Sequence, residues 1–391
     1  MKRFLCIVQG ERRLVLFVLE QTLAPSKMRR RRGFLMNKRR LRGAVIGYGF
    51  ISAVGHVPAY LKRSRDLADV DIVAVADICP SRRNLAQGAL PQASIYGDYR
   101  ELLNANTSKL DFVDISTPPC DHAAIAHAAL ASGFHVLCEK PLSCTIEEAR
   151  SLLQRARAVR RVLFPCHNYR HAPVIKEITK VVQSGRIGKV RSVTLNIYRS
   201  AHAQGVKEWN SHWRRQSRYS GGGIAMDHGS HSFYLTFDWL GSYPTSVSAA
   251  MSNLKPGEYD TEDDFTATLV FPTGSAYVHL TWAAGVRKAI YRVEGEKGAI
   301  TMEDDDLVIE TKHGSHLSDV ENRSIASDWA DASHASWFNP LLDEFRAAID
   351  QGDFAGKEAQ EALLCVQLIN TAYRSAQQGS RELPLPNFLR D

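Results

Sequence analysis

The chain of 391 residues lacks several features that mark secreted, membrane or metal-scaffold proteins. Its seven cysteines are odd in number, scattered and never spaced as CxxC, so no disulfide framework or zinc knuckle is indicated. No apolar run approaches the length that a bilayer span needs. We therefore expect a cytoplasmic protein without a membrane partner.

Most of the chain also lacks an excess of positive charge. The formal net charge is +7, but residues 1–42 hold thirteen Lys or Arg against Glu11 and Glu20. That segment carries +11 and leaves −4 for the rest, which argues against a nucleic-acid partner. Residues 1–40 are predicted to be a basic extension, with 1–35 disordered. A short export signal or a polyanion-binding tail stays an alternative, although Glu20 interrupts the apolar stretch and no usual cleavage site follows.

From Leu41 onward, short apolar runs alternate with helical patterns, which is typical of parallel βαβ units. Strands are expected at 43–46, 70–76, 110–116, 134–138 and 162–164, with 94–96 as a short sixth. The pattern predicts an α/β fold whose first domain, residues 41–164, is a doubly wound Rossmann sheet.

Beyond about residue 165 the strands alternate in polarity and are joined by short links, which favours antiparallel pairing. They are expected at 189–198, 245–251, 264–271, 275–282, 289–294, 299–303 and 307–311. Helices are expected at 173–185, at 223–240, from a cap at Asn339-Pro340 to Gly352, and at 356–375. Residues 313–336 are expected to be loop. The second domain, 165–391, is thus an α/β domain with an open, mainly antiparallel sheet, and its last helices are expected to pack back toward the first domain.

A glycine turn follows the first strand, reading Gly47-Tyr48-Gly49-Phe50-Ile51-Ser52. It departs from GxGxxG at the third glycine, where serine is still small. A strand precedes this turn, a helix follows it, and an acid stands at the end of the next strand. Together these features predict a dinucleotide site, with the pyrophosphate at the start of the helix. Asp77 can accept hydrogen bonds from both ribose hydroxyls and repel a 2′-phosphate, which favours NAD; the alternative is a solvated strand-end carboxylate. Arg82 and Arg83 leave some use of NADP open.

Further polar residues fall at the carboxyl edge of the predicted sheet, where ligands bind in this topology. Ser116-Thr117-Pro118-Pro119 and His122 are interpreted either as cofactor contacts or as a tight turn with a helix start. Lys140 follows another strand, between Glu139 and Pro141. Its ammonium there could donate to an alkoxide or to a carbonyl oxygen that gains charge during hydride transfer.

Asp227 and His231 are spaced i, i+4 on one helix face, with His228 at the border of that face. This cluster could be a metal site, a hydrogen-bonded core cluster or a proton-transfer pair. No fourth ligand is indicated by spacing, so no metal is predicted. The preceding Gly221–Gly223 run would let the backbone approach a ligand closely, which favours proton transfer.

With these motifs in place, residues 41–385 resemble the Gfo/Idh/MocA oxidoreductase family. The motifs that carry the resemblance are GYGFIS at Gly47, EKP at Glu139, CHNYRHAP at Cys166, SGRIGKV at Ser184, GGGIAMDHGSH at Gly221 and FDWLG at Phe237. The resemblance implies a Rossmann domain and a C-terminal α/β domain whose sheet makes dimer or tetramer contacts. It also implies NAD(P)-linked oxidation or reduction of a sugar or cyclitol hydroxyl.

The resemblance to inositol dehydrogenase-like members also implies residue roles. His231 would remove the hydroxyl proton, Lys140 would steady the oxygen, and Asp227 would orient one of them or a neighbouring hydroxyl. Cofactor contacts are predicted for Gly47, Tyr48, Gly49, Phe50, Ile51, Asp77, Arg82, Ser116, Thr117, Pro118, His122, Glu139 and Lys140. Substrate contacts are predicted for Asn168, Tyr169, Arg170 and Trp213. A substrate contact is also predicted for His228, a position that the family pattern does not assign.

Two alternatives stay open beside this dehydrogenase hypothesis. One is a glycosidase that uses tightly held NAD transiently, and the other is a non-catalytic sensor that keeps the cofactor fold. The substrate itself is not identified by the sequence. Arg214, Arg215 and Arg218 in the segment 200–219 would meet an acidic or phosphorylated substrate, or are simply solvated.

Overall fold

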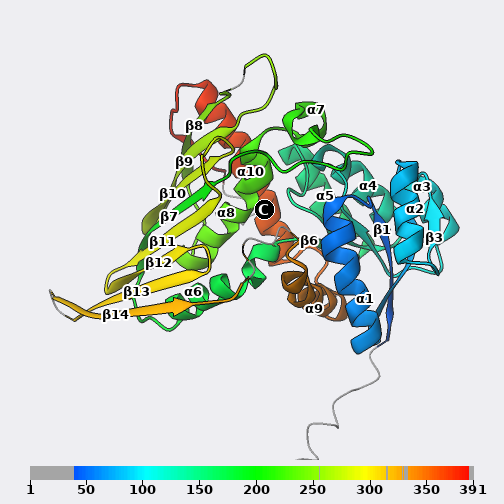
Figure 1. Ribbon diagram of the computed structural model, residues 1–391, viewed down its shortest axis with the longest axis horizontal. Coiled ribbons are helices and arrows are strands. Elements are labelled where there is room, and N and C mark those ends of the chain that lie inside the picture. Colours follow the sequence, from blue (N-terminus) through cyan, green and yellow to red (C-terminus); the bar gives the residue numbers. More distant parts are fainter. Residues whose placement is uncertain (1–38, 255, 314–315, 328, 330–332, 387–391) are drawn as a thin grey trace, which may run out of the picture. The chain divides into compact units, whose positions relative to one another are not determined.

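The computed structural model describes residues 39–254, 256–313, 316–327, 329 and 333–386 (Figure 1). The predicted basic extension, apart from Arg39 and Arg40, lies outside the described residues. Both sheets belong to the unit that begins at Arg40. Among the described residues, no helix is both long enough and apolar enough to span a membrane.

The first sheet has six parallel strands, as the alternating pattern predicts. They are β1 (Leu41–Ile46), β2 (Val70–Ala76), β3 (Ser94–Tyr96), β4 (Phe112–Ile115), β5 (His135–Cys138) and β6 (Leu163–Pro165). Their order is β3-β2-β1-β4-β5-β6. The strand order therefore reverses between β1 and β4, and the carboxyl ends beside that switch point form the ligand crevice in such folds.

Helices connect these strands. A short π-helix, η1 (Ser52–His56), continues into α1 (Val57–Asp66). The other helices of this domain are α2 (Pro80–Ala89), α3 (Tyr99–Ala105), α4 (Pro119–Ala131) and α5 (Ile146–Val159). At the start of α5, Thr145 Oγ1 accepts from the Glu148 amide at 3.3 Å, and the Glu148 carboxylate accepts from the Thr145 amide at 3.2 Å. This reciprocal pair is a capping box that fixes where α5 begins.

The second sheet has nine strands in the order β14-β13-β12-β11-β7-β10-β9-β8-β15. Their bounds are β7 (Val190–Tyr198), β8 (Ser246–Ser252), β9 (Asp264–Phe271), β10 (Gly274–Thr281), β11 (Lys288–Gly295), β12 (Gly298–Glu303), β13 (Asp306–His313), β14 (His316–Ser324) and β15 (Leu383–Pro384). Strand β10 runs parallel to β7, and the other described neighbours are antiparallel.

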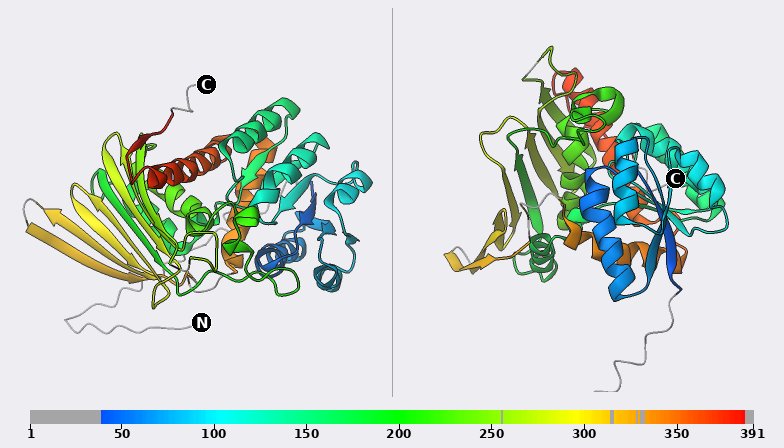
Figure 2. Two further views of the ribbon diagram at one scale, coloured as in Figure 1. Left: turned by 90° about the horizontal axis from the view of Figure 1, so that it is seen from above. Right: turned by 45° about the vertical axis from the view of Figure 1, so that its right-hand side comes forward.

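One face of this sheet packs on the helices α6 (Pro173–Gln183), α8 (Ile224–Leu240) and α10 (Lys357–Gln377), and Figure 2 shows them on the same side. Along β7 the residues Val193, Leu195 and Ile197 are buried in that core, whereas Thr194 and Asn196 on the other face are partly exposed. The predicted alternation of apolar and polar residues arises because successive side chains of a strand point to opposite faces of the sheet, and here the described helices cover only one face.

The expectation of loop across residues 313–336 is wrong for the segment that forms β14. This strand pairs antiparallel with β13 at the edge of the sheet. The described residues 319–324 have no buried side. An edge strand that is solvated on both faces carries no hydrophobic alternation, so its backbone pairing left no signal in the sequence.

Helix α9 (Ala335–Gln351) starts earlier than the predicted cap at Asn339-Pro340, which lies inside the helix. Its first turn carries Trp337 and Phe338, both buried. Packing of these two rings favours helix in the first turn, and the exposed Ser336 carbonyl, which loses its partner at proline, can bond to water.

The last two helices connect both sheets. In α9, Phe345 packs against the six-stranded sheet beside Phe112, with ring centroids 5.5 Å apart. In α10, Ala362 and Val366 pack in the core of the six-stranded sheet, whereas residues nearer the carboxyl end of this helix pack in the core of the nine-stranded sheet. These shared helices hold the carboxyl edge of the first sheet against α8.

Candidate active site

A cavity of about 620 Å³ runs from the carboxyl ends of β1, β2 and β4 to helix α8. Most of the predicted site residues line it, namely Gly47, Gly49, Phe50, Ile51, Asp77, Arg82, Ser116, Thr117, Pro118, Glu139, Lys140, Asn168, Tyr169, Trp213, Asp227, His228 and His231. The topology thus brings residues 47–51 and 227–231 to one site.

The glycine turn at the first end of the cavity is fixed against the end of β4. Gly47 has φ +91°, and a Cβ there would lie 2.7 Å from the Ser116 carbonyl oxygen. Ser52, at the third glycine position, is fully buried and hydrogen-bonds through its hydroxyl to the Gly47 carbonyl and to Ser116 Oγ at 2.7 Å. Serine therefore does more than fit this position, because it ties the turn to the neighbouring strand.

The acid at the end of β2 faces the same turn. Asp77 Oδ2 accepts from the Tyr48 amide at 2.7 Å, and Oδ1 accepts from the Cys79 amide at 2.7 Å. Arg82 donates from Nε to the Tyr48 carbonyl at 2.7 Å and from Nη2 to the Gly49 carbonyl at 3.2 Å. The guanidinium of Arg82 is thus committed to the turn itself.

The first end of the cavity fits a dinucleotide. The glycine turn opens a helix, a carboxylate stands at the next strand end, and both line the cavity. Thr117 Oγ1, at the end of β4, is buried and has no hydrogen-bond partner in the part of the chain that the structure describes, and Thr117 also lines the cavity. A buried hydroxyl without a partner is costly unless a ligand completes it.

Three residues that the sequence placed in the site do not line this cavity. His122 is buried, with Nδ1 2.8 Å from the Pro141 carbonyl oxygen and Nε2 2.9 Å from that of Thr117, so it connects two edges of the site. The Tyr48 ring is buried beneath Arg82. Arg170 instead forms ion pairs with Asp238, Glu358 and Glu361.

The side chains of Lys140 and Asp227 lie close together in the cavity. Lys140 follows β5 of the first sheet, whereas Asp227 belongs to α8, which packs on the second sheet. Lys140 Nζ is 2.5 Å from the Asp227 carbonyl oxygen and 3.3 Å from Oδ1. Burial opposes ionisation of Asp227, but Lys140 and Arg214 together hold the pKa of its carboxyl well below the usual range. The pair is therefore an ammonium held in place by an ionised carboxylate.

His231 lies one helical turn beyond Asp227. Its Nδ1 is 2.8 Å from the Tyr234 hydroxyl, and its ring stacks on Tyr169 with centroids 3.8 Å apart. Burial first, and then the charge of Lys140, lower the pKa of His231 well below its ordinary value. The imidazole is thus neutral near pH 7, and Nε2 is the nitrogen left for a ligand.

Two further polar atoms of the lining, Asn168 Oδ1 and His228 Nδ1, are buried and have no hydrogen-bond partner among the described residues. Burial lowers the pKa of His228 to about 3, and its Nε2 lies 3.7 Å from Asp227 Oδ2. Unsatisfied polar atoms around a cavity are the groups that bind ligand hydroxyls.

The start of α8 is held by a buried carboxylate. Glu262 accepts from the amides of Gly223 and Ala225, each at 2.9 Å, and from the Tyr373 hydroxyl at 2.8 Å. A Cβ at Gly223 would lie 1.8 Å from the Glu262 carbonyl oxygen, and one at Gly222 2.0 Å from Tyr373 Oη. The close approach of the glycine run to these protein groups is one reason that glycine stands here. Gly223 also lines the cavity, and the step from the run to proton transfer stays a prediction.

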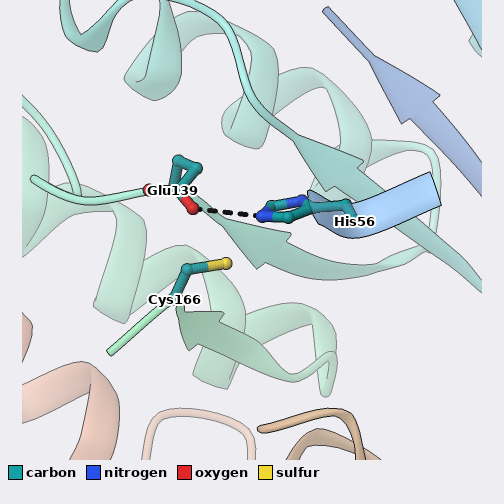
Figure 3. Close-up of side chains that lie close together, drawn as sticks. All are labelled: His56, Glu139 and Cys166. Atoms are coloured by element: carbon teal, nitrogen blue, oxygen red, sulfur yellow. Dashed lines mark hydrogen bonds and ion pairs between the residues drawn. The ribbon is translucent and has the colours of Figure 1, made fainter. Parts of the chain in front are cut away.

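A buried network supports Glu139 from behind (Figure 3). His56 Nδ1 is 2.9 Å from Asp114 Oδ2, and Nε2 is 3.2 Å from Glu139 Oε1. Burial opposes protonation of His56, but the two carboxylates raise its pKa to about 10. Cys166 completes a group whose ligand atoms lie within 4.8 Å of one another, as a metal site would need. Both imidazole nitrogens are already engaged by carboxylates, so an ion pair accounts for this cluster.

Sequence reasoning missed Arg199, Trp282 and Arg287, which line the cavity beside Tyr169. Arg199 directly follows β7, Trp282 follows β10, and Arg287 precedes β11. These strands are neighbours only because of the order of the second sheet. The sequence could have shown that these residues lie at strand ends. It could not show which strand ends become neighbours.

Comparison with known proteins shows the family to which this fold belongs. Residues 41–167 match the model of the oxidoreductase family with an NAD-binding Rossmann fold, and residues 175–301 match the GFO/IDH/MocA C-terminal domain. The fold and the site thus define an NAD-binding oxidoreductase of the dehydrogenase class. The chain belongs to the Gfo/Idh/MocA family.

Relatives match over most of their length. D-glucoside 3-dehydrogenase of Escherichia coli (strain K12) is 27% identical over 368 residues, which cover 87% of this chain and 97% of the relative. Inositol 2-dehydrogenase of Rhizobium meliloti (strain 1021) is 27% identical over 345 residues, covering 84% and 96%. The structure of a levoglucosan dehydrogenase in complex with NADH has TM-score 0.78 and 21% identity, covering 90% of this chain and 100% of that one. This last likeness shows the same fold.

Proposed function

We propose that this protein is an NAD-dependent dehydrogenase that acts on a hydroxyl-bearing carbon of a sugar or cyclitol. The observation that carries the proposal is the convergence of Lys140, Asp227 and His231 on the cavity that also contains the Gly47 turn. The names of the relatives, dehydrogenases of glucosides and inositol, support the substrate class. We also propose residues 41–164 and 165–391 as the cofactor and substrate domains.

NAD, when bound, supplies an acceptor for the hydride that leaves the carbinol carbon. His231 Nε2 takes the proton of the same hydroxyl, since the imidazole is neutral and its Nδ1 is held by Tyr234. Lys140 donates a hydrogen bond to the oxygen as it gains negative charge. Asp227 fixes the ammonium of Lys140 for that contact.

The same site contains groups suited to a polyol. Asn168 Oδ1 and His228 Nδ1 need partners, which neighbouring hydroxyls of the substrate would supply. Trp213 gives an apolar wall for the carbon face of a ring. These contacts explain how one hydroxyl among several would be selected.

Asp77 favours NAD over NADP, because its carboxylate repels a 2′-phosphate. Arg82 is engaged by the carbonyls of the glycine turn, and Arg83 Nη1 donates to the carbonyls of Asp77 and Ile78. Neither guanidinium is thus set aside for a phosphate. Because Arg82 and Arg83 both lie close to Asp77, some use of NADP is compatible with the site.

We further propose a cytoplasmic homodimer or homotetramer. The nine-stranded sheet packs its described helices on one face, and the opposite face presents partly exposed residues such as Tyr277. Sedimentation of the purified full chain would test this assembly, and a monomer at micromolar concentration would contradict it.

The activity is tested by screening sugars and cyclitols for NAD reduction, followed by absorbance at 340 nm, with the cofactor identified after release from purified protein. We expect NADH to accumulate with at least one polyol or aldose, and NADP to be used less well. Release of an aglycone from glycosides without net NADH would instead support the glycosidase. Cofactor binding without any turnover would support the sensor.

A further inference from the structure

The cavity is rich in positive charge at and near the reacting groups. Its lining includes the cationic side chains of Lys140, Arg199, Arg214 and Arg287. Asp227 Oδ1 lies 3.3 Å from Lys140 Nζ and 3.4 Å from Arg214 Nε, so one carboxylate serves two cations. Glu139, the other acid nearby, is engaged by the buried His56. Neither carboxylate forms an ion pair with Arg199.

Arg199 is the most informative of these cations. The residue is only 8% exposed, and its Nη1 donates to the carbonyl oxygens of Tyr198 at 2.8 Å and Lys288 at 3.2 Å. Within the described part of the chain it makes no ion pair with a carboxylate. A buried guanidinium without a counter-charge is costly, and an anion in the cavity would offset that cost.

Arg287 places a second guanidinium within electrostatic reach. Burial first, and then the charge of Arg199, lower the pKa of Arg287, although Tyr169 and Asp304 act in the opposite direction. Arg287 also donates from Nη2 to the Trp329 carbonyl at 3.2 Å. Two guanidinium groups that repel each other beside one cavity form a typical site for a carboxylate or phosphate.

This pair lies next to the proposed proton acceptor. Arg199 contacts the side chain of Tyr169, and the Tyr169 ring stacks on His231. Trp282 lines the cavity at the same end. A substrate that presents its hydroxyl to His231 would thus have a charged group within reach of Arg199 and an aromatic wall beside it.

The three arginines whose role the sequence left open make contacts of their own. Arg215 Nη2 is 3.2 Å from Asp263 Oδ2 in a buried pair, and Arg218 is exposed and donates to Gln216 Oε1 at 3.1 Å. Arg214 shares Asp227 with Lys140. Arg215 and Arg218 do not line the cavity. Recognition of an anion would therefore centre on Arg199, with Arg287 as a second cation beside it.

We propose that the natural substrate is an acidic sugar or cyclitol derivative whose carboxylate or phosphate binds between Arg199 and Arg287. This inference rests on the proposed dehydrogenase function and names the substrate class for that same site. The oxyanion supplies the counter-charge that Arg199 lacks among the described residues, and it fixes which hydroxyl reaches His231.

The test compares matched neutral and acidic compounds with the full-length enzyme and NAD. Glucose is set beside gluconate, glucuronate and glucose 6-phosphate, and myo-inositol beside an inositol monophosphate. We expect kcat/KM for one acidic class to exceed that of its neutral counterpart by about 30-fold or more, as charge-assisted hydrogen bonds allow. Preference for carboxylate or for phosphate then identifies the oxyanion. Equal or better use of the neutral compounds would overturn the proposal.

Two variants locate the effect. R287Q removes one guanidinium, and R199K keeps a donor for the strand-end carbonyls but loses the fork that binds an oxyanion. Each should lower kcat/KM for the acidic substrate by about 10- to 100-fold, mainly through KM, and change that of the neutral counterpart less than about 3-fold. The control is R292Q, on the partly exposed face of β11, where no change is expected. Equal losses for both substrates would assign the arginines a merely structural role.

Direct binding separates this inference from the proposed activity. Isothermal titration calorimetry of the acidic and neutral ligands with the enzyme–NADH complex measures their binding affinities without turnover. Tighter binding of the acid that R287Q abolishes supports the anion site even if no compound reduces NAD, in which case the dehydrogenase proposal alone fails. If NAD is reduced but acids bind no tighter than neutral compounds, the anion site alone fails.

Discussion

His56 Nε2 lies 3.2 Å from Glu139 Oε1, with Asp114 on the other nitrogen, so a buried imidazolium joins two carboxylates behind the site. Glu139 in turn accepts from the Lys140 amide at 3.1 Å through Oε2. The residue that carries the reactive ammonium is thus anchored through its backbone to an ion-pair network within the Rossmann core.

This network predicts a pH dependence of stability. The pKa of folded His56 is about 10, above its ordinary value of 6.5, so its contribution is fully present below about pH 6.5 and is lost as the pH rises toward 10. Urea unfolding between pH 6 and 10 should show this decline. H56Q should be destabilised by about 3 kcal/mol at pH 6.5, because two buried carboxylates lose their cation, and its decline should be shallower. Parallel pH curves for both proteins would contradict the assignment.

Lys140 should be essential for turnover but not for cofactor binding. K140M removes the donor to the reacting oxygen, and kcat should fall by at least about 100-fold. NADH affinity, measured by fluorescence titration, should change little. The control is K180M, on an exposed face of α6, with wild-type kinetics expected. Retained activity of K140M would remove this lysine from the mechanism.

The Tyr234 hydroxyl should set the basicity and orientation of His231. Y234F removes the hydrogen bond to Nδ1 and should lower kcat by about 10-fold, as loss of a group that orients a catalytic imidazole does. Because burial and Lys140 lower the pKa of His231, kcat/KM for oxidation should not fall through loss of the neutral imidazole between pH 6 and 8. H231N should be nearly inactive at every pH in that range. A wild-type profile that loses activity with an apparent pKa near 6.5, absent in H231N, would show that the imidazole is ordinary.

Gly223 is expected to be indispensable for the start of α8. In G223A the new Cβ would meet the Glu262 carbonyl oxygen at 1.8 Å, so we expect at least about 3 kcal/mol of destabilisation in chemical unfolding. G88A in α2 is the matched control, since nothing lies within 4 Å of a Cβ there. That substitution should stabilise by about 0.5–1 kcal/mol through helix propensity. Equal stability of both variants would show that the α8 start rearranges without cost.

The sequence was most informative where a local pattern and its physical cause coincide. The apolar runs that predict strands in the first domain are buried on both faces of β1 and β4. It was least informative where tertiary contacts override local preference. Strand β14 is held by backbone pairing to β13, and the first turn of α9 by burial of Trp337 and Phe338.

The sequence by itself determined the fold class and the NAD cofactor, and it predicted the cofactor turn, the acid at Asp77 and the residues Lys140, Asp227 and His231. Each follows from spacing within one element or from a family motif. Only the tertiary structure decided that Lys140 and Asp227 meet, that the side chains of His122 and Arg170 do not line the cavity, and that those of Arg199 and Arg287 do. These facts depend on which strand ends become neighbours, and that order is set by packing between segments far apart in the chain.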